Sequence, residues 1–194
     1  MKLSTKISIL TFVLAILGIA FLSVLSFKQS NDIFKDNLLE NVSFEVDKTA
    51  LDFEKEIRNI KKDILFISNN EAVYGILRAS KNIYKYDEDE NMHFNAWISR
   101  LEKLFAVMIE QNPAYFQIRF IGIEDNGKEI VRVDKIKNEI IIIKKEALQS
   151  KKTSGYFKNT VKIKDKEIYI SNINLNREHN AIVFPYVPTI RIAT

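Results

Sequence analysis

Polar side chains that could bind an acidic ligand alternate with apolar residues in two neighbouring stretches of the second half of the chain. Tyr115, Gln117 and Arg119 form the first row, and Arg132 and Asp134 form the second. Because alternate residues of a strand share a face, each row would project from one side of a sheet. An arginine guanidinium placed there suits a two-point contact with the carboxylate of a ligand. These five residues are therefore candidate ligand-binding residues.

Arg119 also has a purely structural explanation. It could pair with Glu129 or Asp134 across a hairpin and hold the register of the two strands, since opposite charges on facing strands attract. The sequence leaves both hypotheses open.

Three further candidates lie near the end of the chain. Tyr169, Tyr186 and Arg191 fall in later strands or loops that could face a ligand, although packing or surface roles suit each of them as well. Trp97 lies in an apolar stripe with helical spacing, so we expect it in the core.

No pattern for catalysis or metal binding is recognisable. The chain has no cysteine, which excludes disulfides and thiol chemistry. His93 and His179 are isolated, without a second ligand at metal-binding spacing. The motifs G-x-S-x-G, H-E-x-x-H, the P-loop and the dinucleotide fingerprint are absent. We expect no catalytic residue, no metal and no cofactor in this segment.

The net charge of +4 belongs mainly to the amino end, where Lys2, Lys6 and Lys28 stand without any acid. The remainder holds nearly equal numbers of basic and acidic side chains, and it lacks a basic stripe or a nucleic-acid-binding motif. We interpret Lys144-Lys145 and Lys151-Lys152 as a solvated loop. The chain is therefore not expected to bind nucleic acid.

Residues 1–6 form a short tail ahead of an uncharged apolar run, residues 7–27, which is long enough to cross a hydrocarbon core of about 30 Å. A cleaved signal peptide and a secreted product are the alternative, but no convincing cleavage site follows the run. The lysines ahead of the run favour an inside amino end. We expect a single-pass anchor in the lipid bilayer of the inner membrane, with residues 28–194 outside the cytoplasm.

Residues 28–70 are predicted to form one long amphipathic stalk helix. Its apolar residues follow one another at steps of three or four; they are Leu39, Val42, Val46, Ala50, Phe53, Ile57, Ile60, Ile64 and Ile67. At about 1.5 Å per residue, the helix is longer than one small domain needs. The near-heptad spacing favours a homodimer through the stalk, and the same face could also cover the chain's own sheet.

A helical layer is expected over residues 71–112. Asn69 or Asn70 is placed to cap its first, short helix. An acidic connector at residues 84–90 is expected to be solvated. The longer helix that follows should end at Asn112-Pro113, because the residue before a proline disfavours the α region.

Residues 113–194 are typical of an antiparallel sheet. Two strands, Tyr115 to Ile123 and Lys128 to Asp134, flank Glu124-Asp125-Asn126-Gly127, which is a strong hairpin signal. Further strands are predicted at residues 138–143, 161–163, 168–173 and 189–193.

The stretch AYFQIRFIGIEDNGKEIVRVD (Ala114 to Asp134) combines an aromatic residue, an arginine in the first strand, a turn ending in glycine, and a glutamate and an arginine in the second strand. With YISNINLNREH (Tyr169 to His179) and FPYVPTIRIAT (Phe184 to Thr194), it resembles the extracytoplasmic double-Cache sensor regions of bacterial transmembrane receptors. The resemblance implies an α+β fold with a PAS-like sheet, which the long helix covers on one face and a ligand pocket on the other. Cache proteins continue with more strands, a second module, a second span and an output domain, so we expect the amino-terminal part of a receptor.

The favoured hypothesis is the ligand-sensing input region of a chemoreceptor, a histidine kinase or a diguanylate cyclase, with a small molecule as its partner. The alternative is a membrane-anchored stalk that binds a partner protein instead. A closed pocket lined by Arg119, Arg132 and tyrosines would favour the sensor, because a small ligand needs such a pocket and an adhesive surface does not.

Overall fold

The computed structural model describes residues 3–124, 126–178 and 181–194. Lys2 of the tail, Asp125 of the expected turn and His179 therefore lie outside the described residues. The chain divides into two compact units, Met1–Ile57 and Arg58–Thr194.

Helix α1 (Leu3–Ser68) contains the apolar run that was expected to span a membrane. An 18-residue window within it has a mean hydropathy of 2.7, and none of that window is buried. The helix is thus long and apolar enough to cross a bilayer. Farther along, Leu39, Val42, Val46 and Phe53 of the predicted apolar face are each at least 52 % exposed.

Two further helices, α2 (Glu71–Lys81) and α3 (Phe94–Gln111), form the predicted helical layer. Asn70 caps α2 as predicted, because its side chain accepts a hydrogen bond from the backbone N–H of Ala72 at 2.9 Å. Gly75 lets the helices approach closely, since a Cβ atom there would lie 2.2 Å from the Trp97 ring. Trp97 is 1 % exposed, which confirms its expected place in the core.

The acidic connector between these helices is only partly solvated. It contains the short strands β1 (Tyr86–Asp87) and β2 (Met92–His93), which pair with each other. Asp87 is 1 % exposed and accepts hydrogen bonds from the guanidinium of Arg78 at 2.8 to 3.1 Å. This hydrogen bonding lowers the pKa of Asp87. The prediction of a solvated connector was wrong for Asp87, because Arg78 of the preceding helix α2 pairs with its buried carboxylate.

A three-stranded antiparallel sheet in the order β3-β4-β5 follows the helical layer. Its strands are β3 (Gln117–Gly122), β4 (Lys128–Ile136) and β5 (Glu139–Ile142). The first two form the predicted hairpin, and positive φ angles of 56° at Asn126 and 71° at Gly127 turn the chain between them. The long apolar helix and the antiparallel sheet confirm the mixed α+β class.

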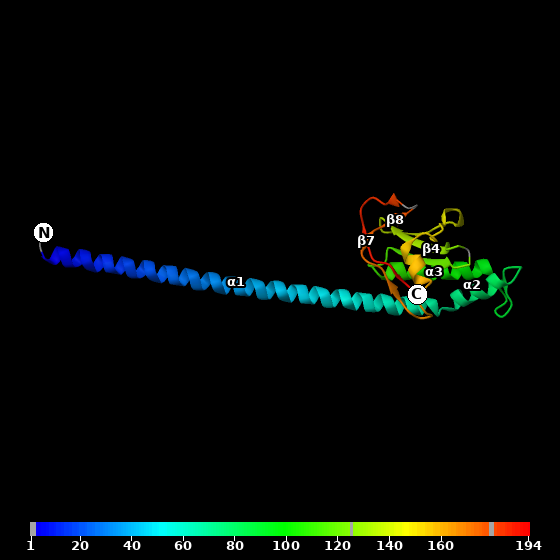
Figure 1. The fold of residues 1–194 in the computed structure, drawn as a ribbon, viewed down its shortest axis with the longest axis horizontal. Coiled ribbons are helices and arrows are strands. Elements are labelled where there is room, and N and C mark those ends of the chain that lie inside the picture. Colours follow the sequence, from blue (N-terminus) through cyan, green and yellow to red (C-terminus); the bar gives the residue numbers. More distant parts are fainter. Residues whose placement is uncertain (1–2, 125, 179–180) are drawn as a thin grey trace. The chain divides into compact units, whose positions relative to one another are not determined.

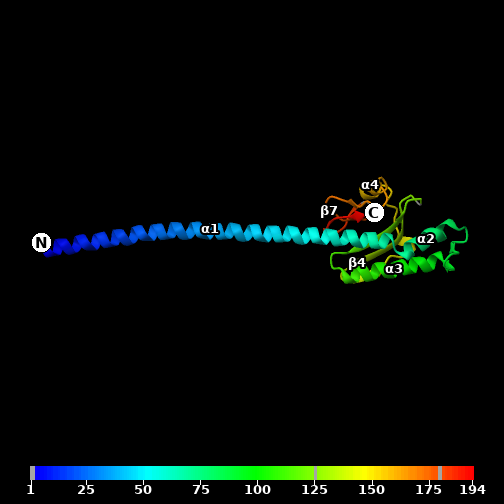
Figure 2. The same ribbon diagram turned by 90° about the horizontal axis from the view of Figure 1, so that it is seen from below.

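Helix α3 packs on one face of this sheet, as Figures 1 and 2 show. The core between them combines residues of α2, α3 and β4, namely Ala72, Val73, Ile76, Ala79, Trp97, Leu101, Phe105, Ile109, Val131 and Val133. Burial of this apolar surface drives the packing of the second unit.

A β-bulge in the hairpin decides which side chains reach the opposite face. Phe120 pairs with Val131, but the next residue of β3, Ile121, pairs with Glu129, so Ile130 is the extra residue. Beyond the bulge the alternation of β4 is shifted by one residue. Glu129 consequently lies on the same face as Arg132, although the two are three positions apart.

The remaining chain is mostly irregular. Its described residues include the 3₁₀ helix η1 (Lys145–Ala147), helix α4 (Gly155–Thr160) and six two-residue strands. The strands pair antiparallel as β6 (Tyr169–Ile170) with β11 (Ile192–Ala193), β7 (Asn174–Leu175) with β10 (Pro188–Thr189), and β8 (Arg177–Glu178) with β9 (Ala181–Ile182).

Three strand predictions in this part need correction. Residues 161–163 form a turn after α4, where the N–H groups of Val161 and Ile163 bond to Phe157 and Thr160 instead of to a neighbouring strand. Residues 168–173 and 189–193 contain only two-residue strand segments. At residues 161–163, short-range hydrogen bonds thus outweigh the apolar alternation.

Candidate functional site

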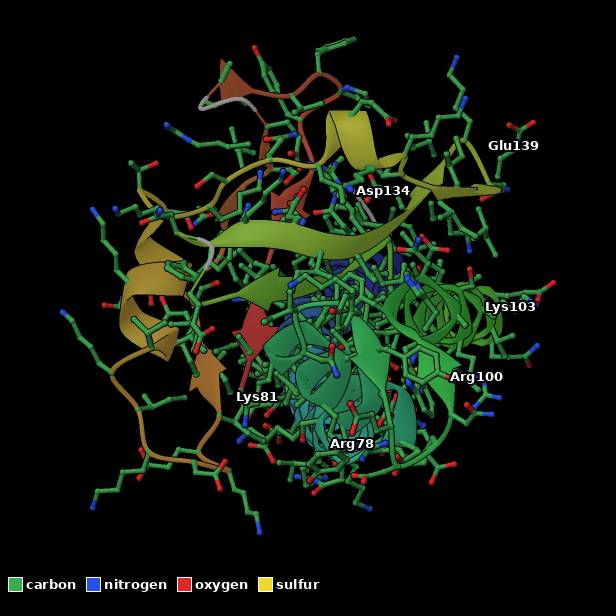
Figure 3. The ribbon with its side chains drawn as sticks, turned by 90° about the vertical axis from the view of Figure 1, so that its right-hand side faces the viewer. Arg78, Lys81, Arg100, Lys103, Asp134 and Glu139 are labelled. Carbon is green, nitrogen blue, oxygen red and sulfur yellow. The ribbon has the colours of Figure 1, made fainter. Side chains whose placement is uncertain are left out.

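The face of the sheet that points away from α3 carries four of the predicted site residues. In the register of the hairpin, Gln117 pairs with Asp134 and Arg119 pairs with Arg132. Two arginines directly opposite each other repel, so this arrangement requires carboxylates between them. Figure 3 shows Asp134 among the side chains on this side of the β4 ribbon.

The carboxylate of Glu178, in β8, supplies the main contact between these arginines. It forms ion pairs with Arg119, with Nη1 of Arg132 at 3.0 Å and with Nζ of Lys151 at 3.1 Å. The side-chain amides of Gln149 and Gln117 donate to it at 3.0 and 3.4 Å. One carboxylate thus gathers three cations and two amides from three segments of the chain.

Two carboxylates of β4 complete the arrangement. Asp134 accepts from Nε and Nη2 of Arg132 at 2.9 and 2.7 Å, a two-point contact, and from Gln117 at 2.7 Å. Glu129 Oε1 lies 3.1 Å from Arg119 Nε and 3.8 Å from Lys151 Nζ. Glu129, which the bulge turns toward Arg119, thus forms one of the ion pairs that the structural explanation predicted.

We call the group formed by Arg119, Glu129, Arg132, Asp134, Lys151 and Glu178 the ionic cluster. Its three positive and three negative side chains balance each other. The cluster is nearly removed from water, since Glu129, Arg132, Asp134 and Lys151 are all 7 % exposed or less. Charges buried to this degree are tolerated only when they are paired.

The ion pairs shift the titration of the cluster. Burial alone would raise the pKa of Glu178, but the positive charges of Arg119, Arg132 and Lys151 outweigh it and lower this pKa to about 2. For Lys151, burial and the nearby charge of Arg119 outweigh the attraction of Glu178 and lower its pKa. Glu178 therefore remains ionised at neutral pH.

A pocket of about 220 Å³ adjoins the cluster, and four predicted site residues line it: Tyr115, Gln117, Arg119 and Arg191. The hydroxyl of Tyr115 donates to Asp63 of α1 at 2.6 Å. The other residues that line this pocket are mainly apolar, with Ile64 and Ile67 of α1 among them. A second pocket, of about 350 Å³, shares Arg119 and Tyr156 with the first.

Three predicted site residues come from the later part of the chain, and Arg191 alone among them lines the first pocket. Arg191 places its guanidinium 5.5 Å from the ring centre of Tyr156 and donates to Asn174 at 2.6 Å. The hydroxyl of Tyr169 accepts from Asn159, and Tyr186 is 66 % exposed with its ring against Phe184. Although both tyrosines are among the described residues, neither lines the two pockets.

The sequence of this chain also matches a known protein family. A family model of the sensor domain of bacterial histidine kinases matches residues 27–194. The chain belongs to this family. A sensor domain is the input part of a receptor, and the chain is accordingly a ligand-sensing input region. The apolar run in α1 agrees with a location at a membrane.

Two solved structures share the fold of this sensor domain. One is the extracellular domain of vpHK1S-Z8, a protein described as a histidine kinase, with 23 % identity and a TM-score of 0.54 over 71 % of this chain. The other, a domain from Vibrio parahaemolyticus described as sensory box/GGDEF family, has 23 % identity and a TM-score of 0.55 over 71 % of this chain. The sensor domain spans 46 % and 48 % of these two chains, respectively. Among curated proteins, none matches it significantly.

Sequence reasoning missed three members of the site. Glu178 lies within the stretch Tyr169 to His179 that supports the resemblance, but nothing in its neighbourhood indicates a partner far away on the sheet. Lys151 was assigned to a solvated loop, which is wrong, because it is 7 % exposed with its Nζ between Glu178 and Glu129. Tyr156, whose hydroxyl accepts from Arg119 at 2.9 Å, carried no signal at all.

Proposed function

We propose that this sensor domain recognises a small acidic molecule outside the cytoplasm, on the sheet face that carries Arg119 and Arg132. Residues 7–27 would cross the inner membrane after a cytoplasmic tail of residues 1–6. The stalk of residues 28–70, the helical layer of residues 71–112 and the sheet of residues 113–194 would then form the receptor's external part.

The observation that carries this proposal is the convergence of three cations, one of which, Arg119, lines a pocket. Arg119, Arg132 and Lys151 meet on a face where buried charge is costly unless it is used or paired. Arg119 also lines the 220 Å³ pocket, with Tyr115, Gln117 and Arg191 around it. This volume is below the range of about 300–1,000 Å³ that is typical of drug-sized ligands, so it suits a small acid.

The response to such a ligand would be a shift between two conformations of the receptor. A ligand changes that equilibrium only by its different affinity for the two states. The output domain, a kinase or a cyclase, would belong to the rest of a longer receptor. The solved neighbours, which are about twice as long as the matched part, support a longer sensor region in such a receptor.

A panel of small carboxylates, tested on the full chain in lipid nanodiscs, measures the proposed function. We expect at least one acid to raise the melting temperature in a saturable manner, because a ligand that binds only the folded state stabilises it. Arg119→Gln should abolish the effect, whereas Arg177→Gln, the same change at an exposed position, should retain it. If no acid stabilises the chain, or if both variants respond equally, the partner-binding stalk becomes the better hypothesis.

We further propose that two copies associate through the middle of α1. Leu39, Val42, Val46 and Phe53 leave an exposed apolar row at the spacing that parallel helices use. Because the chain has no cysteine, single substitutions report on this contact without background. Val46→Cys should form a disulfide-linked dimer in membranes, and Lys48→Cys, on the opposite side of the helix, should not. Equal cross-linking of the two would contradict a specific dimer.

A further inference from the structure

Glu178 occupies the position that an acidic ligand would need. Two side-chain nitrogens of Arg119 already donate hydrogen bonds, Nη1 to Tyr156 and Nη2 to Glu178. Its Nε lies 3.1 Å from Glu129 Oε1. Arg132, through Nη1, and Lys151, through Nζ, also form ion pairs with Glu178. The Glu178 carboxylate already lies where these three cations meet. A ligand carboxylate can therefore bind all three together only by taking its place.

The backbone around Glu178 belongs to a different ladder from its cationic partners. Strand β8 pairs with β9, and this pair is separate from the three-stranded sheet that holds Arg119 and Arg132. Side chains make the connection, through the ion pairs and through the amides of Gln149 and Gln117. Such contacts can break without disrupting the strands of either ladder.

The charge balance explains why the exchange is favourable only for an anion. With Glu178 withdrawn, three cations would face Glu129 and Asp134 alone, leaving an unpaired positive charge in a nearly dry site. An unpaired buried charge is strongly destabilising, so the site would remain closed until another acid group arrives. A ligand carboxylate restores the balance, and a neutral molecule does not.

We propose that Glu178 is an internal competitor of the ligand: its carboxylate occupies the anion site formed by Arg119, Arg132 and Lys151, and the ligand's carboxylate displaces it. Binding would then break the side-chain contacts that hold β8 against the three-stranded sheet. This proposal rests on the proposed function and adds the regulation of the same site. Displacing Glu178 costs free energy, so the apparent affinity for the ligand is lower than the affinity of a site from which Glu178 is already withdrawn.

Chemical rescue tests the exchange, because Glu178→Ala removes a fragment equivalent to acetate. The full chain in nanodiscs is melted at increasing acetate concentrations, with chloride holding the ionic strength constant. The apparent dissociation constant follows from the rise in melting temperature. We expect acetate to bind Glu178→Ala and Glu178→Gln at least about tenfold more tightly than the unaltered chain.

Glu139→Gln provides the matched control. Glu139 is exposed at the start of β5 and points away from the sheet in Figure 3, so the variant loses the same charge outside the cluster. It should respond to acetate like the unaltered chain. Should Glu178→Ala be poorly folded without acetate, the recovery of its circular dichroism with acetate, but not with chloride, would support the proposal equally.

Two results would overturn the proposal, and they are distinguishable. If acetate binds all variants with similar affinity and Arg119→Gln abolishes the binding, the anion site is real but Glu178 does not compete for it. If acetate affects neither the unaltered chain nor the Glu178 variants, the carboxylate site itself is rejected, and the proposed function fails with it.

Discussion

The two faces of strand β4 are equally buried but are held together by different forces. Val131 and Val133, toward α3, are 1 % and 0 % exposed, while Glu129 and Asp134 on the other face are 1 % and 5 % exposed. Apolar burial is non-directional and stabilises in proportion to the area removed from water. Charged groups lose their hydration on burial, and only well-placed charged or hydrogen-bonding partners offset the free energy that this loss costs.

This difference assigns separate roles to the two faces. The apolar face tolerates small changes of shape and keeps the helices on the sheet. The ionic face is near balance, so the loss or exchange of a single carboxylate changes its energy sharply. A site of this kind suits a sensor, since a ligand needs to alter only a few contacts to change the conformation.

The largest effect is expected on the apolar face. Trp97→Ala would leave a cavity between α2, α3 and the sheet, and we expect the free energy of unfolding to fall by about 4 kcal/mol. Denaturation followed by circular dichroism measures the loss. Acid binding by the folded fraction should be unchanged, and a changed affinity would mean that the two faces are coupled.

A slightly smaller loss is expected on the ionic face. Arg132→Gln removes the cationic partner of Asp134 and one of the three cations around Glu178. The free energy of unfolding should fall by about 3 kcal/mol. Adding Glu178→Gln should restore part of this loss, because it removes one of the stranded charges. A double-mutant cycle measures the coupling, and strictly additive losses would contradict a shared cluster.

Acid should weaken the ionic face selectively. The pKa of Glu178 is about 2 in the folded chain and near 4.5 in the unfolded one, so the folded state binds its proton less readily. The stabilisation is complete above about pH 5 and is lost as the pH falls toward 2, by no more than about 3 kcal/mol. Glu178→Gln should flatten the dependence of stability on pH in this window. An unchanged slope would argue against the ion pairs of Glu178.

The smallest effect is expected where the same chemistry is exposed. Glu139→Gln removes a carboxylate from a solvated strand end, and stability should change by no more than about 0.5 kcal/mol. If Glu139→Gln lowered the stability as much as Arg132→Gln, the burial of a charge among its partners would not explain the large effect on the ionic face. Equilibrium unfolding in urea decides between them.

Much of the fold was predictable because its signals are local. The spacing of apolar residues indicated helix α3, Asn69 or Asn70 followed by Glu71 indicated the start of helix α2, and Asn126-Gly127 indicated the hairpin turn. The strands that failed, at residues 161–163 and beyond, are short runs whose conformation depends on turns and on partners distant in sequence. The sequence of these short runs favours neither strand pairing nor a turn, so it does not predict which of the two forms.

The sequence by itself determined that Gln117 and Arg119 share one face of a strand, and that an apolar segment long enough to cross a membrane precedes the domain. Period-two and helical spacing are properties of the backbone, so they appear without knowledge of any contact. Only the tertiary structure decided the composition of the ionic cluster. A bulge at Ile130 turned Glu129 toward Arg119, and folding of distant loops delivered Lys151 and Glu178. Ion pairs depend on positions in space, and residues 46 to 59 positions apart, such as Glu178 with Arg132 and Arg119, leave no trace of their pairing in the local pattern.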